Sequence, residues 1–175
     1  RAHAHSGSDD LARRTFLELA EQRHYYGFMA AKQLNQSISL NAKELVLDSR
    51  QLNRLSQSKP LQTALALYQV GERWWALQAW NQAMRSLTEE EGLAAGLVAY
   101  DLGWHDRAIM AMAEFGEKNL LDVRFPQAFV AEFRAAAAEH KQSLSWLYAI
   151  ARRESAFDPE VRSRTNAYGL MQILP

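Results

Sequence analysis

Apolar residues in the long segments of this chain recur at intervals of three and four positions, with polar and charged residues between them. This spacing places the apolar side chains on one face of an α-helix, whereas a half-buried strand would show strict alternation. Only four prolines and eight glycines interrupt the 175 residues. The pattern therefore predicts an all-α protein.

The periodic segments between these breaks define the expected helices. The first is expected over Asp9 to Leu34, because Leu11, Phe16 and Tyr26 belong to a broad apolar face. Further helices are expected at Ala42 to Gln57, Leu61 to Val70, Arg73 to Leu87, Thr88 to Leu102, Trp104 to Phe115, Gln127 to Glu139 and Leu144 to Glu154. The middle of the chain thus resembles stacked helical hairpins.

Local signals support several of these boundaries. Thr88 followed by Glu91 has the spacing of a capping box, and Gly103 can end a helix. Ser143 or Ser145 is expected to cap the last helix. Phe125 precedes Pro126, and a residue before proline is pushed out of the helical region. We therefore expect a flexible end over residues 1–9, one helical domain over 10–126 and a second domain beginning at 127.

The amino-acid composition excludes only a few classes of function. Lys plus Arg equals Asp plus Glu at 20 each, so no overall charge favours nucleic acid or an anionic membrane. The chain has no cysteine, which fits a reducing cytosol and an oxidising periplasm equally. No apolar run approaches the roughly 18 residues of a membrane-spanning helix, so no integral membrane segment is expected. The start lacks the apolar centre of a signal peptide, which leaves a processed protein or an excised piece.

Cofactor chemistry has no signature here. No glycine-rich phosphate loop, no H-E-x-x-H pattern and no serine–histidine–acid arrangement occurs, so we expect no metal and no cofactor. His3 and His5 stand in a short polar stretch that is typical of a flexible end. A set of tryptophans could form either a sugar-stacking surface or helix core, and core is the expectation: Trp74, Trp75, Trp80 and Trp104.

One carboxylate stands out near the C-terminus. Glu154 shares a helical face with the apolar positions Leu147, Ile150 and Ala151. Burial in that stripe and the negative end of the helix dipole would both favour the neutral carboxyl, which suits a general acid. The alternative is a boundary glutamate paired with Arg152, Arg153 or Arg162.

The residues around Glu154 also resemble a known signature. ESAFDP, then Ser163, then NAYGLMQILP follows the pattern of the soluble lytic murein transglycosylases: E-S-x-aromatic-x-P, a serine four residues later, and G-A-x-G-L-M-Q. Upstream, HYYGFMAAKQLN and LDVRFPQAF resemble the helical linker of the same family. The resemblance implies a linker of superhelical type over 10–126, followed by the first helices of a lysozyme-like catalytic domain over 127–175.

The family resemblance implies cleavage of the β-1,4 bond between N-acetylmuramic acid and N-acetylglucosamine in peptidoglycan. Glu154 would protonate the leaving oxygen and then, as a base, take the proton of the muramic C6 hydroxyl, which closes a 1,6-anhydro ring. Most glycosidases need two carboxylates for their chemistry. Asp158 has the context of a turn residue and Glu160 that of a solvated one, so a single acid is expected to act here.

The resemblance assigns further roles in the same segment. Ser155 would support the helix end, Ser163 would lie near the carboxyl and the sugar, and the sugar groove would be lined by Tyr168, Gly169, Met171 and Gln172. From the residues alone, Ser163 could be an ordinary loop hydroxyl and Met171 a core residue. Asn166 replaces the glycine usual in the family, but asparagine tolerates a positive φ.

The family's catalytic domain continues well past MQILP, so we expect a truncated chain that is inactive by itself. The implied location is periplasmic, with peptidoglycan strands as substrate and cell-wall proteins as possible partners. A rival interpretation is a non-catalytic helical scaffold that binds glycan strands or a cell-wall protein. Simple hydrolysis, which would leave reducing ends, is a third.

Overall fold

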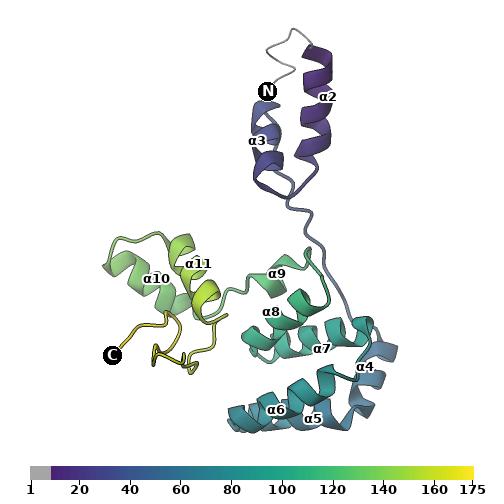
Figure 1. The fold of residues 1–175 in the computed structure, drawn as a ribbon, viewed down its shortest axis with the longest axis vertical. Coiled ribbons are helices and arrows are strands. Elements are labelled where there is room, and N and C mark those ends of the chain that lie inside the picture. The colour runs from purple at the N-terminus through teal and green to yellow at the C-terminus, as the bar shows by residue number, and fades with distance from the viewer. Residues whose placement is uncertain (1–8) are drawn as a thin grey trace. The chain divides into compact units, whose positions relative to one another are not determined.

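The computed structural model describes residues 9–175, which form helices joined by turns and loops (Figure 1). The helices are α2 (Asp9–Ala20), α3 (Tyr25–Gln33), α4 (Ser49–Gln57), α5 (Lys59–Gln69), α6 (Arg73–Met84), α7 (Glu89–Asp101), α8 (His105–Glu114), α9 (Leu121–Arg124), α10 (Val130–Glu139) and α11 (Leu144–Glu154). Within this range no β-strand occurs, which confirms the all-α prediction. The predicted flexible end at residues 1–9 falls, except for Asp9, outside the described residues.

The chain divides into two compact units between Lys43 and Glu44. In the first unit, α2 and α3 pack through small side chains, with a core of Ala20, Ala30 and Ala31. The prediction of one continuous helix from Asp9 to Leu34 is therefore wrong.

The two helices separate at a tight turn over residues 21–24. His24 caps α3, because its Nδ1 accepts a hydrogen bond from the Gly27 nitrogen at 3.0 Å. A Cβ atom at Gly27 would lie 1.9 Å from the Gln22 carbonyl oxygen, so the turn requires glycine at this position. The turn could not be recognised in the sequence, because the apolar periodicity continues on both sides of it.

In the second unit, α4 begins seven residues later than the expected start at Ala42. Its N-cap is Asp48, whose carboxylate accepts from the Gln51 nitrogen while the Gln51 side chain accepts from the Asp48 nitrogen. This capping box fixes the helix start. Residues 42–48 are irregular, and the expected helix is wrong over that stretch.

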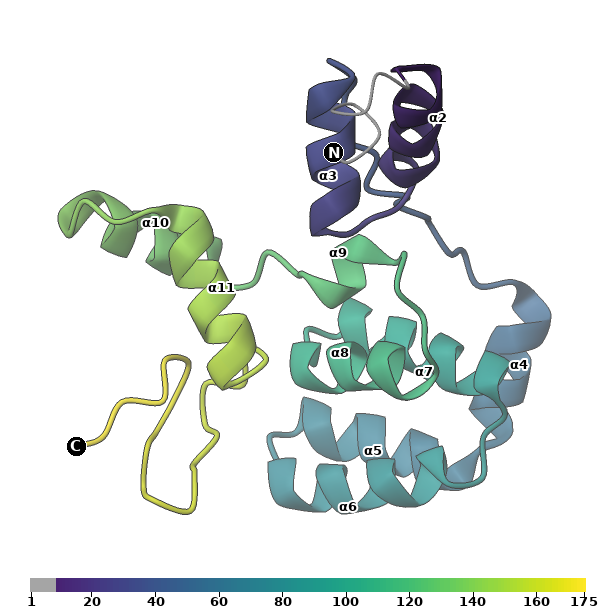
Figure 2. The same cartoon turned by 45° about the horizontal axis from the view of Figure 1, so that its top comes forward.

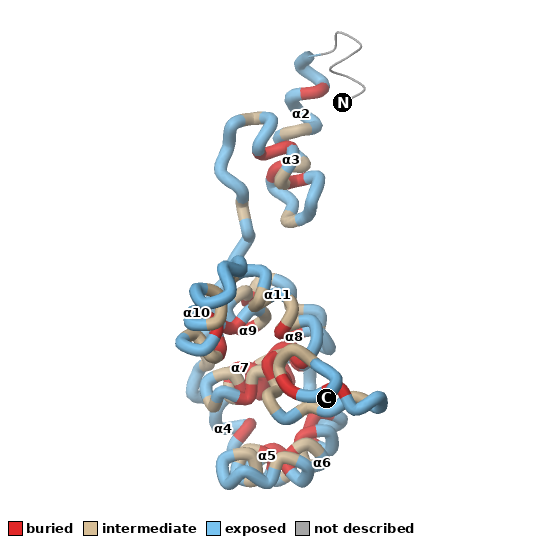
Figure 3. The backbone as a smooth tube through the Cα atoms, turned by 90° about the vertical axis from the view of Figure 1, so that its left-hand side faces the viewer, coloured by how far each residue is buried: buried red, intermediate tan, exposed pale blue. Residues whose placement is uncertain are grey.

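Helices α5 and α6 form one hairpin, and α7 and α8 form the next (Figure 2). Buried positions occur on all four helices and make one continuous core (red in Figure 3). Trp80 and Trp104 lie in this core, as expected. Trp74 and Trp75 do not, since 62% and 58% of their surfaces are exposed. Their placement in the core was a wrong prediction, because both occupy the solvent side of the first turn of α6.

The second hairpin follows its sequence signals closely. The Thr88 hydroxyl accepts from the Glu91 nitrogen at 3.3 Å, and the Glu91 carboxylate accepts from the Thr88 nitrogen at 3.0 Å. The predicted capping box is thus confirmed. Gly103 ends α7 with a φ of +75°, a conformation that glycine adopts at little cost.

The break at Phe125 and Pro126 is present, and the chain crosses it after the short helix α9. Beyond it, α10 starts three residues later than expected, whereas α11 spans the expected residues at both ends. Ser143 is its N-cap and accepts from the Trp146 nitrogen. The division of the chain into domains at residue 126 stays a prediction.

The capping box gives a direct stability test. Thr88→Ala leaves the Glu91 nitrogen at the start of α7 without its acceptor and should lower the free energy of unfolding by about 1 kcal/mol. Urea denaturation measures the change. Ser58 is the matched control, because it caps α5 without a side-chain hydrogen bond. A loss in Ser58→Ala equal to that in Thr88→Ala would contradict the assignment.

Candidate active site

Glu154 is the last residue of α11, and the helix ends in a tightly tied turn. The Ser155 hydroxyl donates to the Ala151 carbonyl oxygen at 2.9 Å and accepts from the Phe157 nitrogen at 3.1 Å. Ala156 and Phe157 follow with φ values of 50° and 67°. Such values are uncommon outside glycine and persist only where the surroundings impose them. Here the imposed turn sends Phe157 into a core with Phe133.

The Glu154 side chain is exposed. The expected burial is therefore wrong: Ala151 is fully buried and Leu147 and Ile150 are half-buried, but the stripe leaves the core at its last turn. Within residues 9–175 the Glu154 carboxylate has no hydrogen bond and no ion pair. The carboxylate lies at the C-terminal end of α11 and is accessible to a ligand.

Two of the three arginines considered as partners of Glu154 make other contacts. The Arg152 Nε donates to the Arg124 carbonyl oxygen at 2.6 Å, and its guanidinium lies 4.7 Å from the centre of the Phe125 ring. Arg162 lies 5.0 Å from the centre of the Tyr168 ring. The pairing of Glu154 with a neighbouring arginine, the alternative considered from the sequence, is thus not formed for these two.

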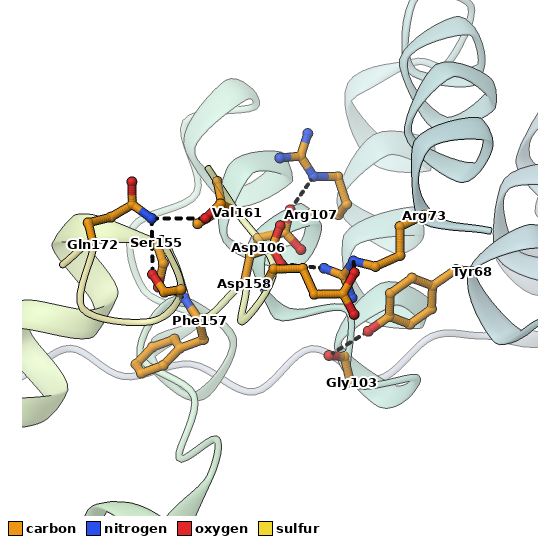
Figure 4. Close-up of polar contacts among 12 residues, drawn as sticks. Tyr68, Arg73, Gly103, Asp106, Arg107, Ser155, Phe157, Asp158, Val161 and Gln172 are labelled. Atoms are coloured by element: carbon orange, nitrogen blue, oxygen red, sulfur yellow. Dashed lines mark hydrogen bonds and ion pairs between the residues drawn. The ribbon is translucent and has the colours of Figure 1, made fainter. Parts of the chain in front are cut away.

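The two other acids of the segment are bound to one side chain of α6. The Arg73 guanidinium contacts Asp158 at 2.5 Å (Figure 4) and also contacts Glu160, at 3.4 Å. Asp158 also accepts from the Glu160 nitrogen at 3.0 Å, which is the turn role expected from its context. Sequence reasoning missed Arg73, because 85 residues separate it from Asp158.

The loop after this contact is organised by Ser163. Its hydroxyl accepts from the nitrogens of Thr165 and Ala167, at 3.2 and 2.9 Å. Asn166, where the family pattern has glycine, adopts a φ of 68° within this turn. The left-handed turn is therefore retained with asparagine.

The following residues form a second small turn. Gly169 has a φ of 75°, and its nitrogen donates to the Val161 carbonyl oxygen at 3.0 Å. The Gln172 amide nitrogen donates to the carbonyl oxygens of Val161 and Gly169, both at 3.0 Å. Met171 packs against the core around Phe157, whereas Tyr168 is 47% exposed. Of the predicted sugar-binding side chains, Tyr168 is thus the one that faces outward most.

A cavity of about 610 Å³ lies behind α11. It is lined by side chains of Phe125, Tyr148, Arg152 and Phe157, among others. Tyr148 and Arg152 point away from the Glu154 side of the helix, given the helical spacing. Arg153, the residue before Glu154, also lines the cavity, but Glu154 itself does not.

An ion pair of α8 lies close to Arg73 and Asp158. Asp106 of α8 is 8% exposed and pairs with Arg107 at 2.7 Å. Burial raises the pKa of Asp106; Arg107 acts in the opposite direction, and Asp158 adds to the rise. Burial lowers the pKa of the neighbouring His105. The ion pair of Arg73 and Asp158 thus lies near a polar cluster, Asp106 and Arg107, that is largely shielded from water.

Comparison with known proteins identifies two family segments in this chain. The family described as "Soluble lytic murein transglycosylase L domain" matches residues 54–116, and that described as "Transglycosylase SLT domain" matches residues 132–175. A putative soluble lytic murein transglycosylase of Haemophilus influenzae is 30% identical over 90% of this chain and 26% of its own length. The chain belongs to the soluble lytic murein transglycosylase family.

Solved structures of lytic transglycosylases have a similar fold. An inactive mutant of the lytic transglycosylase Slt from Pseudomonas aeruginosa has a TM-score of 0.85 and 32% identity, covering 93% of this chain and 26% of that one. The 70-kDa soluble lytic transglycosylase from Escherichia coli has a TM-score of 0.83 and 26% identity, covering 99% and 28%. The chain thus spans about a quarter of the length of these relatives. In the described part, no helix has the length and apolar character needed to span a membrane.

The buried Asp106 predicts an unusual dependence of stability on pH. Because its pKa is raised in the folded state, the folded protein binds more protons than the unfolded one between the raised pKa and the ordinary one. Its charged form costs stability at neutral pH, and acidification removes that cost. The unfolding free energy of wild type minus that of Asp106→Asn should therefore increase from pH 7 towards about pH 4, near the ordinary Asp pKa.

Urea titrations of both proteins at several pH values in this interval measure the difference. A difference that falls on acidification would mean that Asp106 is stabilised as the anion, which would contradict the role assigned to burial.

Proposed function

We propose that the protein cleaves the β-1,4 bond between N-acetylmuramic acid and N-acetylglucosamine in peptidoglycan and leaves a 1,6-anhydromuramic end. The observation that supports this proposal most strongly is how the three acids of residues 154–175 are paired. Arg73 binds both Asp158 and Glu160, whereas Glu154 has no partner in the described chain. One carboxylate is therefore available for chemistry, which suits an intramolecular ring closure better than a two-carboxylate mechanism.

Glu154 is proposed to act twice on one proton pathway. As the acid, it protonates the glycosidic oxygen while the bond to the muramic C1 breaks. As the resulting carboxylate, it takes the proton of the C6 hydroxyl, whose oxygen then bonds to C1. The proton count balances without water, and Glu154 ends protonated for the next cycle. Because Glu154 is held at the end of a helix, its side chain loses less conformational entropy when it reaches the reactive geometry with the sugar.

The neighbouring loop is proposed to hold the sugar. Tyr168 offers an exposed ring for stacking, and Ser163 lies in the turn that follows the Asp158 contact. Gly169, Met171 and Gln172 are proposed to shape the groove, chiefly through the backbone that their contacts fix.

Ser155 is proposed to support the end of α11, where Glu154 lies. The solved Pseudomonas Slt mutant supports a functional glutamate in this family, because it is inactive and carries a glutamine in place of a glutamate. That change keeps the shape of the side chain and removes its capacity to exchange a proton. Glu154 is the residue of this chain to which we assign the same function.

A periplasmic location follows from the proposed substrate, because peptidoglycan lies outside the cytoplasmic membrane. Cell-wall proteins are proposed as possible partners. The rival scaffold function has one observation in its favour: Trp74 and Trp75 form an exposed edge-to-face pair with ring centres 4.4 Å apart. Such a surface can stack on sugars without cleaving them.

The test uses the protein expressed from its full natural reading frame and purified peptidoglycan. Mass spectrometry should find 1,6-anhydromuropeptides with wild type, and Glu154→Gln should reduce their release by at least about a hundredfold, because the amide cannot cycle a proton. Glu132→Gln is the matched control, since Glu132 is an exposed acid of α10 that takes no part in the Arg73 contact. It should retain most of the activity.

Other outcomes select other functions. Products with reducing ends in place of anhydro ends would replace transglycosylation by hydrolysis. Binding of peptidoglycan by a folded wild-type protein that releases no products would favour the scaffold.

A further inference from the structure

The Arg73 guanidinium joins the two matched family segments of the second unit. It extends from the first turn of α6 and reaches two acids in the turn after α11, and the Arg73 and Asp158 side chains are only 25% and 19% exposed. Partial burial excludes much of the water that weakens an exposed ion pair, and the two contacts use different guanidinium nitrogens. The geometry suits arginine and not lysine.

Arg73 is itself held by the hairpin core. Its guanidinium lies 5.6 Å from the centre of the Tyr68 ring. The Tyr68 hydroxyl donates to the Gly103 carbonyl oxygen at 3.1 Å (Figure 4). The Tyr68 ring stacks on the buried Trp104, with ring centres 4.4 Å apart. A continuous set of contacts therefore runs from the core of the hairpins to Asp158.

Little freedom remains between Asp158 and Glu154. Ser155 ties this turn at both ends by its two hydrogen bonds, and Phe157 is anchored in the core. A contact that fixes Asp158 therefore restricts the path of the chain on the far side of Glu154. It also fixes the point from which the Ser163 loop begins.

We infer that Arg73 and Asp158 are positioning residues for Glu154, through which the helical linker holds the turn that follows the catalytic helix. Neither is placed at the reacting atoms. The inference rests on the proposed function for its catalytic consequence, but the mechanical claim, that this contact holds the turn, is independent of it.

The kinetic test compares Arg73→Gln, Asp158→Asn and the double variant on soluble glycan strands. Each single change should lower kcat about tenfold or more with little change in KM, because a small misplacement of a catalytic group has large effects. The double variant should lose no more than Arg73→Gln alone, since that change already removes the contact with Asp158. The exchanged pair Arg73→Asp with Asp158→Arg should recover part of kcat.

The mechanical test needs no activity. Trypsin cleaves after Arg162 and Arg164, which lie in the loop that Asp158 precedes. Cleavage at these bonds should be several times faster in Asp158→Asn than in wild type when both are folded, because the loop opens more often. Arg54→Gln is the control, since Arg54 meets Glu90 only in an exposed pair at 3.9 Å. It should change neither cleavage nor kcat.

Three results would overturn the inference. They are unchanged kcat in both single variants of an active enzyme, losses that multiply in the double variant, and loop cleavage no faster than in wild type. A lowered urea midpoint with unchanged kcat would assign the pair to stability alone. If the wild type itself released no anhydro products, the proposed function would fail, whereas the cleavage result would still decide whether Arg73 holds the loop.

Discussion

The bridge from Arg73 to Asp158 and Glu160 is the interaction on which the candidate site depends. It spans 85 residues and connects a helical hairpin to the turn beside Glu154. Charge-assisted contacts of this kind are stronger and more directional than neutral ones. The stacked Tyr68 and Trp104 support it from the core side. Without the bridge, the path of the chain after Glu154 would depend on local contacts such as the Ser155 turn and the Phe157 anchor.

The same bridge explains why one acid remains available. A guanidinium that neutralises Asp158 and Glu160 removes two candidates for a second catalytic carboxylate. Glu154 projects from a helix that is anchored in the core by Ala151 and by the aromatic cluster around Phe157. A substrate bound beside this carboxylate would exclude water from it, and loss of water favours the neutral acid form that the first proton transfer requires.

Much of the fold could be predicted because its signals are local. The capping box at Thr88, the stop at Gly103 and the full span of α11 each depend on residues close together in the chain. The turn at Gly27 could not be predicted, because it depends on a close approach of backbone to a carbonyl oxygen. The irregular stretch before Asp48 was missed for a related reason: its composition permits a helix, and the cap that ends it lies further on.

The site was predictable only in part. Motif and helical spacing indicated Glu154 and its neighbours as a candidate site, but spacing could not show that the apolar stripe ends one turn before the carboxylate. Nor could it find Arg73, since nothing in a single sequence relates residues so far apart. The exposed Trp74 and Trp75 show the same limit, because periodicity gives a helical face and not the partner that covers it.

Hydrogen exchange of the backbone amides tests the role of the bridge most directly. The Gly169 nitrogen donates to Val161, and the Ala167 nitrogen to Ser163, within the loop that follows the bridge. If the Arg73 contact holds this loop, these amides should exchange at least about tenfold faster in Arg73→Gln than in wild type, while amides of α7 keep their rates. Equal exchange of the loop in the two proteins would contradict this role of Arg73.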